Sequence, residues 1–291
     1  MATVTLSEEV SQSELRDAIA KYHGLNPRDD VAARKRGTTE LIMAVGYEET
    51  EYSRTRLLQK TLRDAELSFS NEGGKTVVRI PATEKSRTIV AQINRILSET
   101  SRPKISTSEI RVSHLGTPEA RTAFFTSLIV SIAGHKLQTV TRVRVATLQA
   151  GTAHADDLDV AIEENKAAEQ EMLGIVKHVA LSGDNLVASS MFQDLIAKGF
   201  FVTSISWRAV RNEKPPHILS LEAAFEGKAD GTGFKYGVTG VTAFANGSYN
   251  KSQRPPQDGE RKQLLLLLEA AAESSLAKAE ALDVTPIGSD E

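Results

Sequence analysis

The feature that most constrains the fold of this chain is an order of elements that occurs twice in its second half. The first copy covers residues 109–146 and the second covers residues 174–211. In each copy a short apolar segment, a polar turn and an apolar helical segment are followed by a glycine, Gly134 or Gly199, and then by a longer alternating segment. The order is shared, although few residues are identical. Each copy predicts a βαβ-like unit.

Two βαβ-like units restrict the architecture further. A strand, a helix and a second parallel strand normally connect by a right-handed crossover, so both helices are expected on one face of a mixed sheet. The helix of the first copy has a clear start, because Thr117 can cap it and Pro118 suits the first helical position. The second half of the chain is therefore predicted to be an α/β sheet domain, residues 109–250.

The longest predicted strand in this domain, residues 137–148, alternates between apolar and polar side chains. Val143 and Val145 are expected on one face, and Arg142 and Arg144 on the other. Two further strands are predicted downstream, joined as a hairpin by the loop 227–233, at residues 217–225 and 234–244.

The first 98 residues are predicted to form a helical domain that contains one β-hairpin. The periodicity of apolar residues places the hairpin at 67–81 and helices at 7–24, 30–45, 51–66 and 83–97. A polar segment with Pro103 then marks the boundary with the sheet domain. After a linker, residues 260–282 are predicted to form a C-terminal helix. The expected fold class is thus α+β.

Three helices followed by a hairpin match the order of a winged helix. The third helix would occupy the position that reads the major groove of DNA, and it carries Arg54, Arg56, Lys60 and Arg63. The alternative interpretation is that these charges solvate an amphipathic helix that packs within the protein. Arg142 and Arg144 form a second candidate contact for nucleic acid, on the polar side of the predicted long strand.

Charge is distributed unevenly along the chain. Residues 51–100 carry a net +3 and residues 101–150 a net +5, whereas residues 151–200 carry a net −6. A basic middle region can attract an anionic partner, or it can meet the acidic block of the same protein. Aromatic residues make up only 5% of the chain, which disfavours a base-stacking platform.

Several chemistries are excluded or disfavoured. The chain has no cysteine, which excludes thiolate nucleophiles, thiolate metal sites and disulfides. The acidic segment 154–159 is interpreted as a helix start, where the dipole favours carboxylates, so no metal or cofactor is expected. The start of the chain lacks the pattern of a signal peptide, and the longest aliphatic run, Leu264–Leu268, is too short for a bilayer. A cytoplasmic location and no membrane partner are therefore expected.

One enzyme hypothesis can be stated with residues. Glu222, Glu226 and Lys228 end a predicted strand in Glu-x-Lys, an arrangement used by metal-dependent nucleases, with Asp184 as a second acidic ligand. Such residues are also common at exposed strand ends. An enzyme is therefore the less favoured class, and no catalytic residue is assigned.

The sequence favours a regulatory or interaction protein whose basic surface contacts nucleic acid. The main alternative is a structural or assembly subunit. In that case the C-terminal helix, apolar on several faces at Leu264–Leu268, would mediate self-association or contact a protein partner. Docking of this helix on its own domain explains the same pattern equally well.

Overall fold

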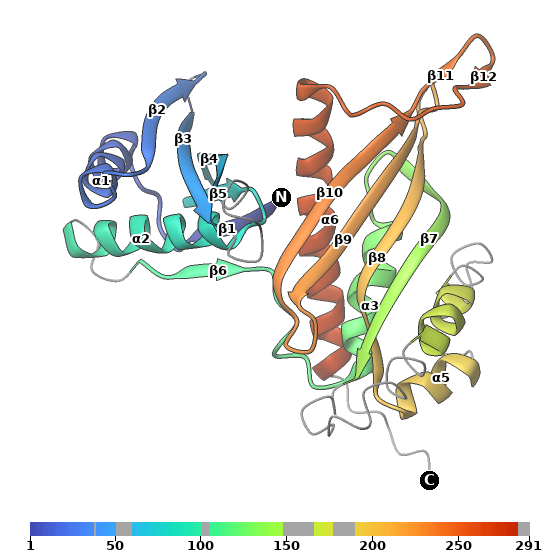
Figure 1. The fold of residues 1–291 in the computed structure, drawn as a ribbon. Helices are drawn as coiled ribbons and strands as arrows, with labels where there is room; N and C mark the ends of the chain where they lie inside the picture. Colours follow the sequence, from blue (N-terminus) through green and yellow to red (C-terminus); the bar gives the residue numbers. More distant parts are fainter. Residues whose placement is uncertain (38, 51–59, 101–104, 148–165, 177–189, 285–291) are drawn as a thin grey trace. The chain divides into compact units, whose positions relative to one another are not determined.

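The structure is a computed structural model that describes residues 1–37, 39–50, 60–100, 105–147, 166–176 and 190–284. It divides into two compact units, Met1–Glu109 and Ile110–Glu291, which we call the N-terminal and the C-terminal unit. Both combine helices with an antiparallel sheet, so the protein is of mixed α+β type (Figure 1). Each unit is described by itself.

The N-terminal unit is built on a six-stranded sheet with strand order β2-β3-β4-β5-β1-β6, in which every neighbouring pair is antiparallel. Two helices, α1 and α2, pack against each other (Figure 1). Along the chain the elements are β1 (Ala2–Leu6), α1 (Gln12–Leu25), β2 (Asp30–Arg36), β3 (Glu40–Thr50), β4 (Lys60–Glu72), β5 (Lys75–Ile80), α2 (Glu84–Thr100) and β6 (Thr107–Glu109).

The core of the N-terminal unit forms between its helices and one face of its sheet. Leu41 and Met43 of β3 are completely buried, and they belong to one cluster with Ile19 of α1 and with Ile89 and Ile93 of α2. Burial of such aliphatic side chains contributes about 1.5–3 kcal/mol each. This cluster lies entirely within residues 1–109, so the unit has a core of its own.

The predicted helical N-terminal domain is wrong, and with it the winged helix. Residues 30–36, 40–45 and 60–66, expected in helices, lie in β2, β3 and β4. The apolar run Leu41–Val45 fits a buried strand as well as a buried helix, because a run this short has no decisive periodicity. Pairing on both sides with β2 and β4 places it in the sheet, where its backbone groups are satisfied.

Other local predictions for this unit are confirmed. The hairpin forms between β4 and β5, with Gly73 and Gly74 at φ 59° and 77°, a conformation that favours glycine. The first and last predicted helices exist as α1 and α2, although α1 begins later than expected. Its cap is Ser11, which accepts from the backbone N–H of Glu14 while the Glu14 carboxylate accepts from the backbone N–H of Ser11.

The C-terminal unit contains a four-stranded antiparallel sheet with strand order β10-β9-β8-β7. Residues 166–176 are also helical, and β11 and β12 form a separate small hairpin. The elements are α3 (Pro118–Val130), β7 (His135–Thr147), α5 (Ser190–Ala197), β8 (Phe200–Arg211), β9 (Ile218–Gly227), β10 (Thr232–Thr242), β11 (Phe244–Ala245), β12 (Ser248–Tyr249) and α6 (Asp258–Val284).

Helices α3 and α6 lie side by side and cover one face of this sheet (Figure 1). Phe124 and Phe125 of α3 pack against Phe225 of β9, with ring centroids 5.5 and 5.6 Å apart, and Phe124 also meets Phe234 of β10 at 5.3 Å. The only tryptophan, Trp207 on β8, is 1% exposed. The covered face is therefore apolar and closely packed, which leaves the opposite face for polar side chains.

The predicted βαβ-like units are wrong. The strand before α3 is β6, which pairs with β1 of the N-terminal unit's sheet, and β7 pairs antiparallel with β8. In the second copy, residues 174–176 are helical and residues 177–189 lie outside the described part. The same order of helices and strands along a chain is compatible with a parallel or an antiparallel sheet, because only the pairing of strands distant in sequence distinguishes the two.

The local signals within both copies are nevertheless confirmed. Thr117 caps α3 by accepting from the backbone N–H of Ala120, and proline occupies the start of this helix. Gly199 adopts φ 80° between α5 and β8. The downstream hairpin forms from β9 and β10, and the C-terminal helix forms as α6.

Candidate functional site

The N-terminal residues predicted to bind nucleic acid do not lie on a helix. Arg54 and Arg56 fall outside the described residues, whereas Lys60 and Arg63 lie on β4. Lys60 Nζ is 2.8 Å from Glu48 Oε1, and Arg63 Nε is 3.0 Å from Glu49 Oε2. Glu48 and Glu49 are on β3, the neighbouring strand. These ion pairs reduce the positive charge that β4 can offer to a phosphate.

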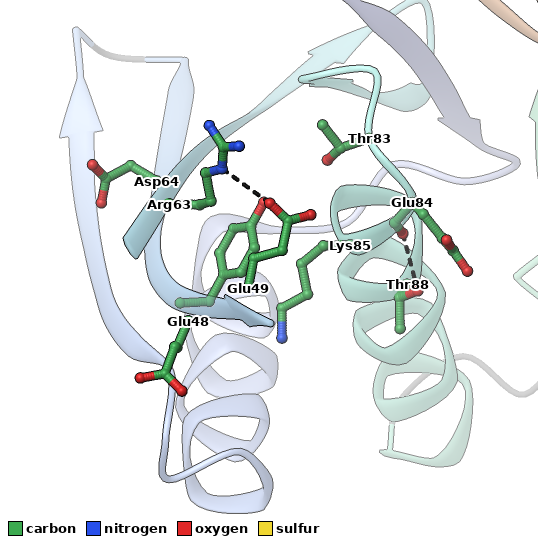
Figure 2. A pocket seen from close by; sticks show the side chains of 9 residues that line it. Glu48, Glu49, Arg63, Asp64, Thr83, Glu84, Lys85 and Thr88 are labelled. Carbon is green, nitrogen blue, oxygen red and sulfur yellow. Dashed lines mark hydrogen bonds and ion pairs between the residues drawn. The ribbon is translucent and has the colours of Figure 1, made fainter. Parts of the chain in front are cut away.

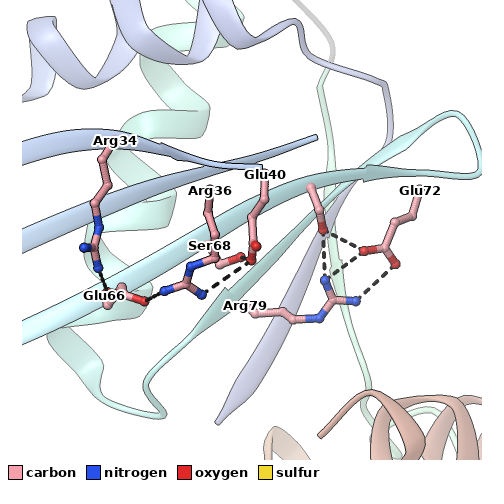
Figure 3. Close-up of polar contacts among 8 residues, drawn as sticks. Arg34, Arg36, Glu40, Glu66, Ser68, Glu72 and Arg79 are labelled. Atoms are coloured by element: carbon pink, nitrogen blue, oxygen red, sulfur yellow. Dashed lines mark hydrogen bonds and ion pairs between the residues drawn. The ribbon is translucent and has the colours of Figure 1, made fainter. Parts of the chain in front are cut away.

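Further basic side chains of the N-terminal sheet are also paired (Figure 3). Arg34 and Arg36 of β2 each approach Glu66 of β4 at 2.7 Å. Arg79 of β5 lies 2.8 Å from Glu72. The exposed pairs of Arg34 and Arg36 contribute little to stability, about 0–1 kcal/mol each, but they lower the electrostatic potential of the surface.

A cavity of about 700 Å³ lies in the N-terminal unit, between β3, β4 and the start of α2 (Figure 2). Carboxylates outnumber cations in its lining, which consists of Tyr47, Glu48, Glu49, Arg63, Asp64, Thr83, Glu84, Lys85 and Thr88. An anionic ligand would therefore meet an unfavourable field in this cavity.

Lys85 at the edge of this cavity is held by a buried network. Its Nζ lies 2.8 Å from Asp29 Oδ2, and the Tyr22 hydroxyl donates to the same oxygen at 2.6 Å. Burial and the neighbouring Asp29 raise the pKa of Tyr22. Lys85 also lies over the ring of Tyr47, 5.3 Å from its centroid. This lysine thus has an internal electrostatic partner.

The C-terminal sheet differs from the N-terminal sheet, whose cations are mostly paired. We call its face opposite to α3 and α6 the open face. Its side chains come from alternate positions of β7, β9 and β10, and of β8 from Ser204 onward, opposite to the buried positions. The predicted alternation in β7 is confirmed, because Val143 and Val145 are buried whereas Arg142 and Arg144 are exposed.

Strand register places the side chains of the open face in rows. The central row runs Arg142, Ser206, Glu222 and Gly237 from β7 to β10. The row on one side is Arg144, Ser204, Ala224 and Lys235, and on the other side Arg208 is paired with Ser220. The face therefore has a floor of small residues between long charged side chains.

The cations of the open face are unpaired. In the part of the chain that the structure describes, the side chains of Arg142, Arg144, Arg208 and Lys235 form no ion pair or hydrogen bond, and all four are exposed. Two carboxylates, Glu222 and Glu226, share the face with them. Positive charge is thus in excess, and its groups are free to meet an anion.

A shallow cavity of about 310 Å³ lies on the open face. Arg142, Arg208 and Glu222 contribute its charged side chains, and Ser206 and Thr239 contribute hydroxyls. At one end, Gln253 donates from Nε2 to Ser220 Oγ at 2.8 Å and thus reaches over β9. Guanidinium and hydroxyl groups in one shallow cavity can bind a phosphate, because both donate hydrogen bonds to its oxygens.

The predicted nuclease residues are not brought together in this way. Glu222 and Glu226 lie on the same side of β9, but four residues of strand separate them by about 13 Å, far more than the ~2–2.5 Å of metal–oxygen bonds. Asp184 lies outside the described residues. Among the residues that the structure describes, no group of three or more His, Asp or Glu side chains could hold a metal ion. None of the described helices is long and apolar enough to cross a membrane.

Comparison of the chain with protein-family models, with curated proteins and with solved structures found no match in any of the three. The fold and the candidate site define the class: a two-unit α+β protein with a cationic open sheet face.

Sequence analysis does not identify Arg208 or Lys235 as members of this face, and it considers Glu222 only as a nuclease ligand. The signal for Arg208 was present, because Ser204, Ser206 and Arg208 alternate with buried residues along β8. Their proximity to Arg142 depends on the antiparallel pairing of β7 with β8, which the local sequence does not specify.

Proposed function

We propose that the C-terminal unit binds the sugar–phosphate backbone of a nucleic acid on its open face. The observation that supports this most is the set of unpaired cations, Arg142, Arg144, Arg208 and Lys235, on one side of a single sheet. Lys60 and Arg63 of the N-terminal sheet instead pair with carboxylates. Unpaired surface cations are what a polyanion requires, since they exchange condensed counterions for direct contacts.

The shape and composition of the open face agree with contact to the backbone. Small residues such as Ser206 and Gly237 form its floor, so a chain can approach the sheet closely. The aromatic rings of the sheet are buried and offer no stacking surface; they belong to Phe200, Phe201, Trp207, Phe225, Phe234 and Tyr236. Binding of this kind depends on phosphates and has little dependence on base sequence.

The test is a fluorescence-anisotropy titration of the full chain with labelled oligonucleotides at several salt concentrations. Each phosphate contact adds about 0.7 to the slope of log affinity against log salt for a single strand. Arg142→Ala, Arg144→Ala and Arg208→Ala are each expected to lower this slope by about that amount and to weaken binding about tenfold at low salt.

A matched control comes from the paired cations. Lys60→Ala and Arg63→Ala also remove positive charge, yet they are expected to leave the affinity nearly unchanged. If these variants weaken binding and the β7 and β8 variants do not, the open face is not the site. An absence of binding even at low salt would overturn the proposal and favour the assembly role instead.

A further inference from the structure

We infer that the open face distinguishes RNA from DNA, with Glu222 accepting a hydrogen bond from a ribose 2′-hydroxyl. This inference rests on the proposed function and assigns the class of nucleic acid. It starts from one exposed carboxylate, Glu222, which stands in the central row of a face where cations are in excess and lines the same cavity as Arg142 and Arg208.

Glu222 is available for a ligand. Its side chain has no ion pair or hydrogen bond to any described residue, despite the arginines that share its cavity. The carboxylate lies over Gly237 of β10, with Oε1 3.6 Å from the point where a Cβ of that glycine would stand. The Glu222 side chain is exposed, so its carboxylate is accessible to a ligand. A carboxylate repels a phosphate and accepts hydrogen bonds, so its partner must be a donor.

The register of the sheet sets where that donor must lie. Ser206 stands between Arg142 and Glu222 in the central row, one strand from each, and strands are about 4.8 Å apart. A phosphate held by the two arginines lies over Ser206, within reach of its hydroxyl. The acceptor is then only one strand further across the sheet.

A ribose hydroxyl meets this requirement better than a base does. The sugar is bonded directly to the phosphate, whereas the base extends away from it. Stacking does not draw the base toward the floor either, because the floor consists of Ser206, Ser220, Ala224 and Gly237. The 2′-hydroxyl is the donor that RNA has and DNA lacks. The arginines thus provide affinity and Glu222 provides discrimination.

The experiment compares oligo-uridine with oligo-deoxyuridine of the same length, which differ only at the 2′ position. In anisotropy titrations of the full chain we expect oligo-uridine to bind about tenfold more tightly, the effect of one hydrogen bond to a charged group. A 2′-O-methyl oligo-uridine, which has no donor at this position, should bind like the deoxy strand.

Glu222→Ala should bring the ratio of the two affinities close to one. Removal of a negative charge also raises the affinity for both strands, but the ratio does not depend on that effect. Glu213→Ala is the matched control, because Glu213 is an exposed carboxylate paired with Arg211 and does not line the cavity. It should leave the ratio unchanged, and the fluorescence of buried Trp207 verifies that each variant is folded.

The outcomes separate the inference from the function on which it rests. Equal, salt-sensitive binding of both strands by the unaltered protein would overturn the role of Glu222 and leave backbone binding in place. A preference for oligo-uridine that persists in Glu222→Ala would likewise overturn it. If neither strand binds at low salt, the proposed function itself fails.

Discussion

At the scale of single residues, Asp283 near the end of α6 shows how one carboxylate joins two helices. It accepts hydrogen bonds from the backbone N–H groups of Gly116 and Thr117, at 3.1 and 3.2 Å, and from the Thr117 hydroxyl at 3.0 Å. These groups precede α3, where a negative charge also suits the helix dipole. The N–H of Gly116 is the largest cause of the lowered pKa of Asp283, followed among the favourable contacts by Thr117.

This contact predicts a dependence of stability on pH. Because folding lowers the pKa of Asp283, its stabilising contribution is present above the ordinary value of 3.8 and is lost as the pH falls through the lower value of the folded state. Asp283→Asn should therefore destabilise the C-terminal unit at neutral pH, and the difference from the unaltered protein should shrink in acid.

Urea unfolding followed by the fluorescence of Trp207 at a series of pH values measures this difference. Asp194→Asn, at an exposed position of α5, is the control and should change little. A difference between Asp283→Asn and the unaltered protein that stays constant into acid would contradict the assignment.

At the scale of elements, α3 is the helix that most clearly organises the C-terminal unit. It packs on both β8 and α6, and its Phe124 and Phe125 rings meet edge-on at 5.1 Å within the aromatic cluster of the sheet. Thr122 of the same helix accepts a hydrogen bond from the backbone N–H of Val202 on β8. Helix α3 therefore packs on the covered face of the sheet. Because side chains of a strand alternate between the two faces, this packing determines which side chains of β8 lie on the open face.

Removal of one ring from α3 should have a large effect. Phe124 is completely buried, so Phe124→Ala is expected to lower the free energy of unfolding by about 3–5 kcal/mol, through lost transfer energy and the cavity that remains. Val130→Ala, at a position of the same helix that is 57% exposed, should cost well under 1 kcal/mol. Urea denaturation followed by Trp207 fluorescence compares the two. Equal losses would contradict the described packing.

At the scale of the whole molecule, the chain consists of two units with separate cores. The buried cluster formed by α1, α2 and the first sheet contains only residues of the N-terminal unit. Helix α6 docks on α3 and β10 of its own unit and buries Leu264 and Leu268 there. Docking within the C-terminal unit thus accounts for Leu264 and Leu268, whereas Leu266 of the same apolar run is 38% exposed.

This organisation predicts that the N-terminal unit folds without the rest. A fragment of residues 1–109 should unfold cooperatively on heating, because its core is complete. Truncation of the full chain after residue 257 should destabilise the C-terminal unit, since it removes α6 and exposes Phe234 and Tyr236 of β10, on which α6 packs.

Circular dichroism follows the fragment, and fluorescence of Trp207 follows the truncated chain. A fragment without a cooperative transition, or a truncated chain in which Trp207 stays buried, would show that the units depend on different contacts from those described.

The local features of this protein were decided by the sequence itself. Thr117 and Pro118 start a helix, Gly73-Gly74 turns a hairpin, and the alternation around Val143 separates a buried from an exposed face. Each of these features depends on residues within a few positions of each other. Such interactions have the same consequence in almost any surrounding structure.

Tertiary structure alone decided the topology and the candidate site. Leu41–Val45 became a strand because β2 and β4 pair with it, and β7 became antiparallel to β8 rather than parallel to a preceding strand. Strand pairing also decides which cations are available: Arg142 on β7 has no ion-pair partner among the described residues, whereas Arg63 on β4 pairs with Glu49 of the neighbouring β3. The physical reason is common to all three: backbone hydrogen bonds between strands and ion pairs across them join residues far apart in the chain, and a local pattern does not specify its distant partner.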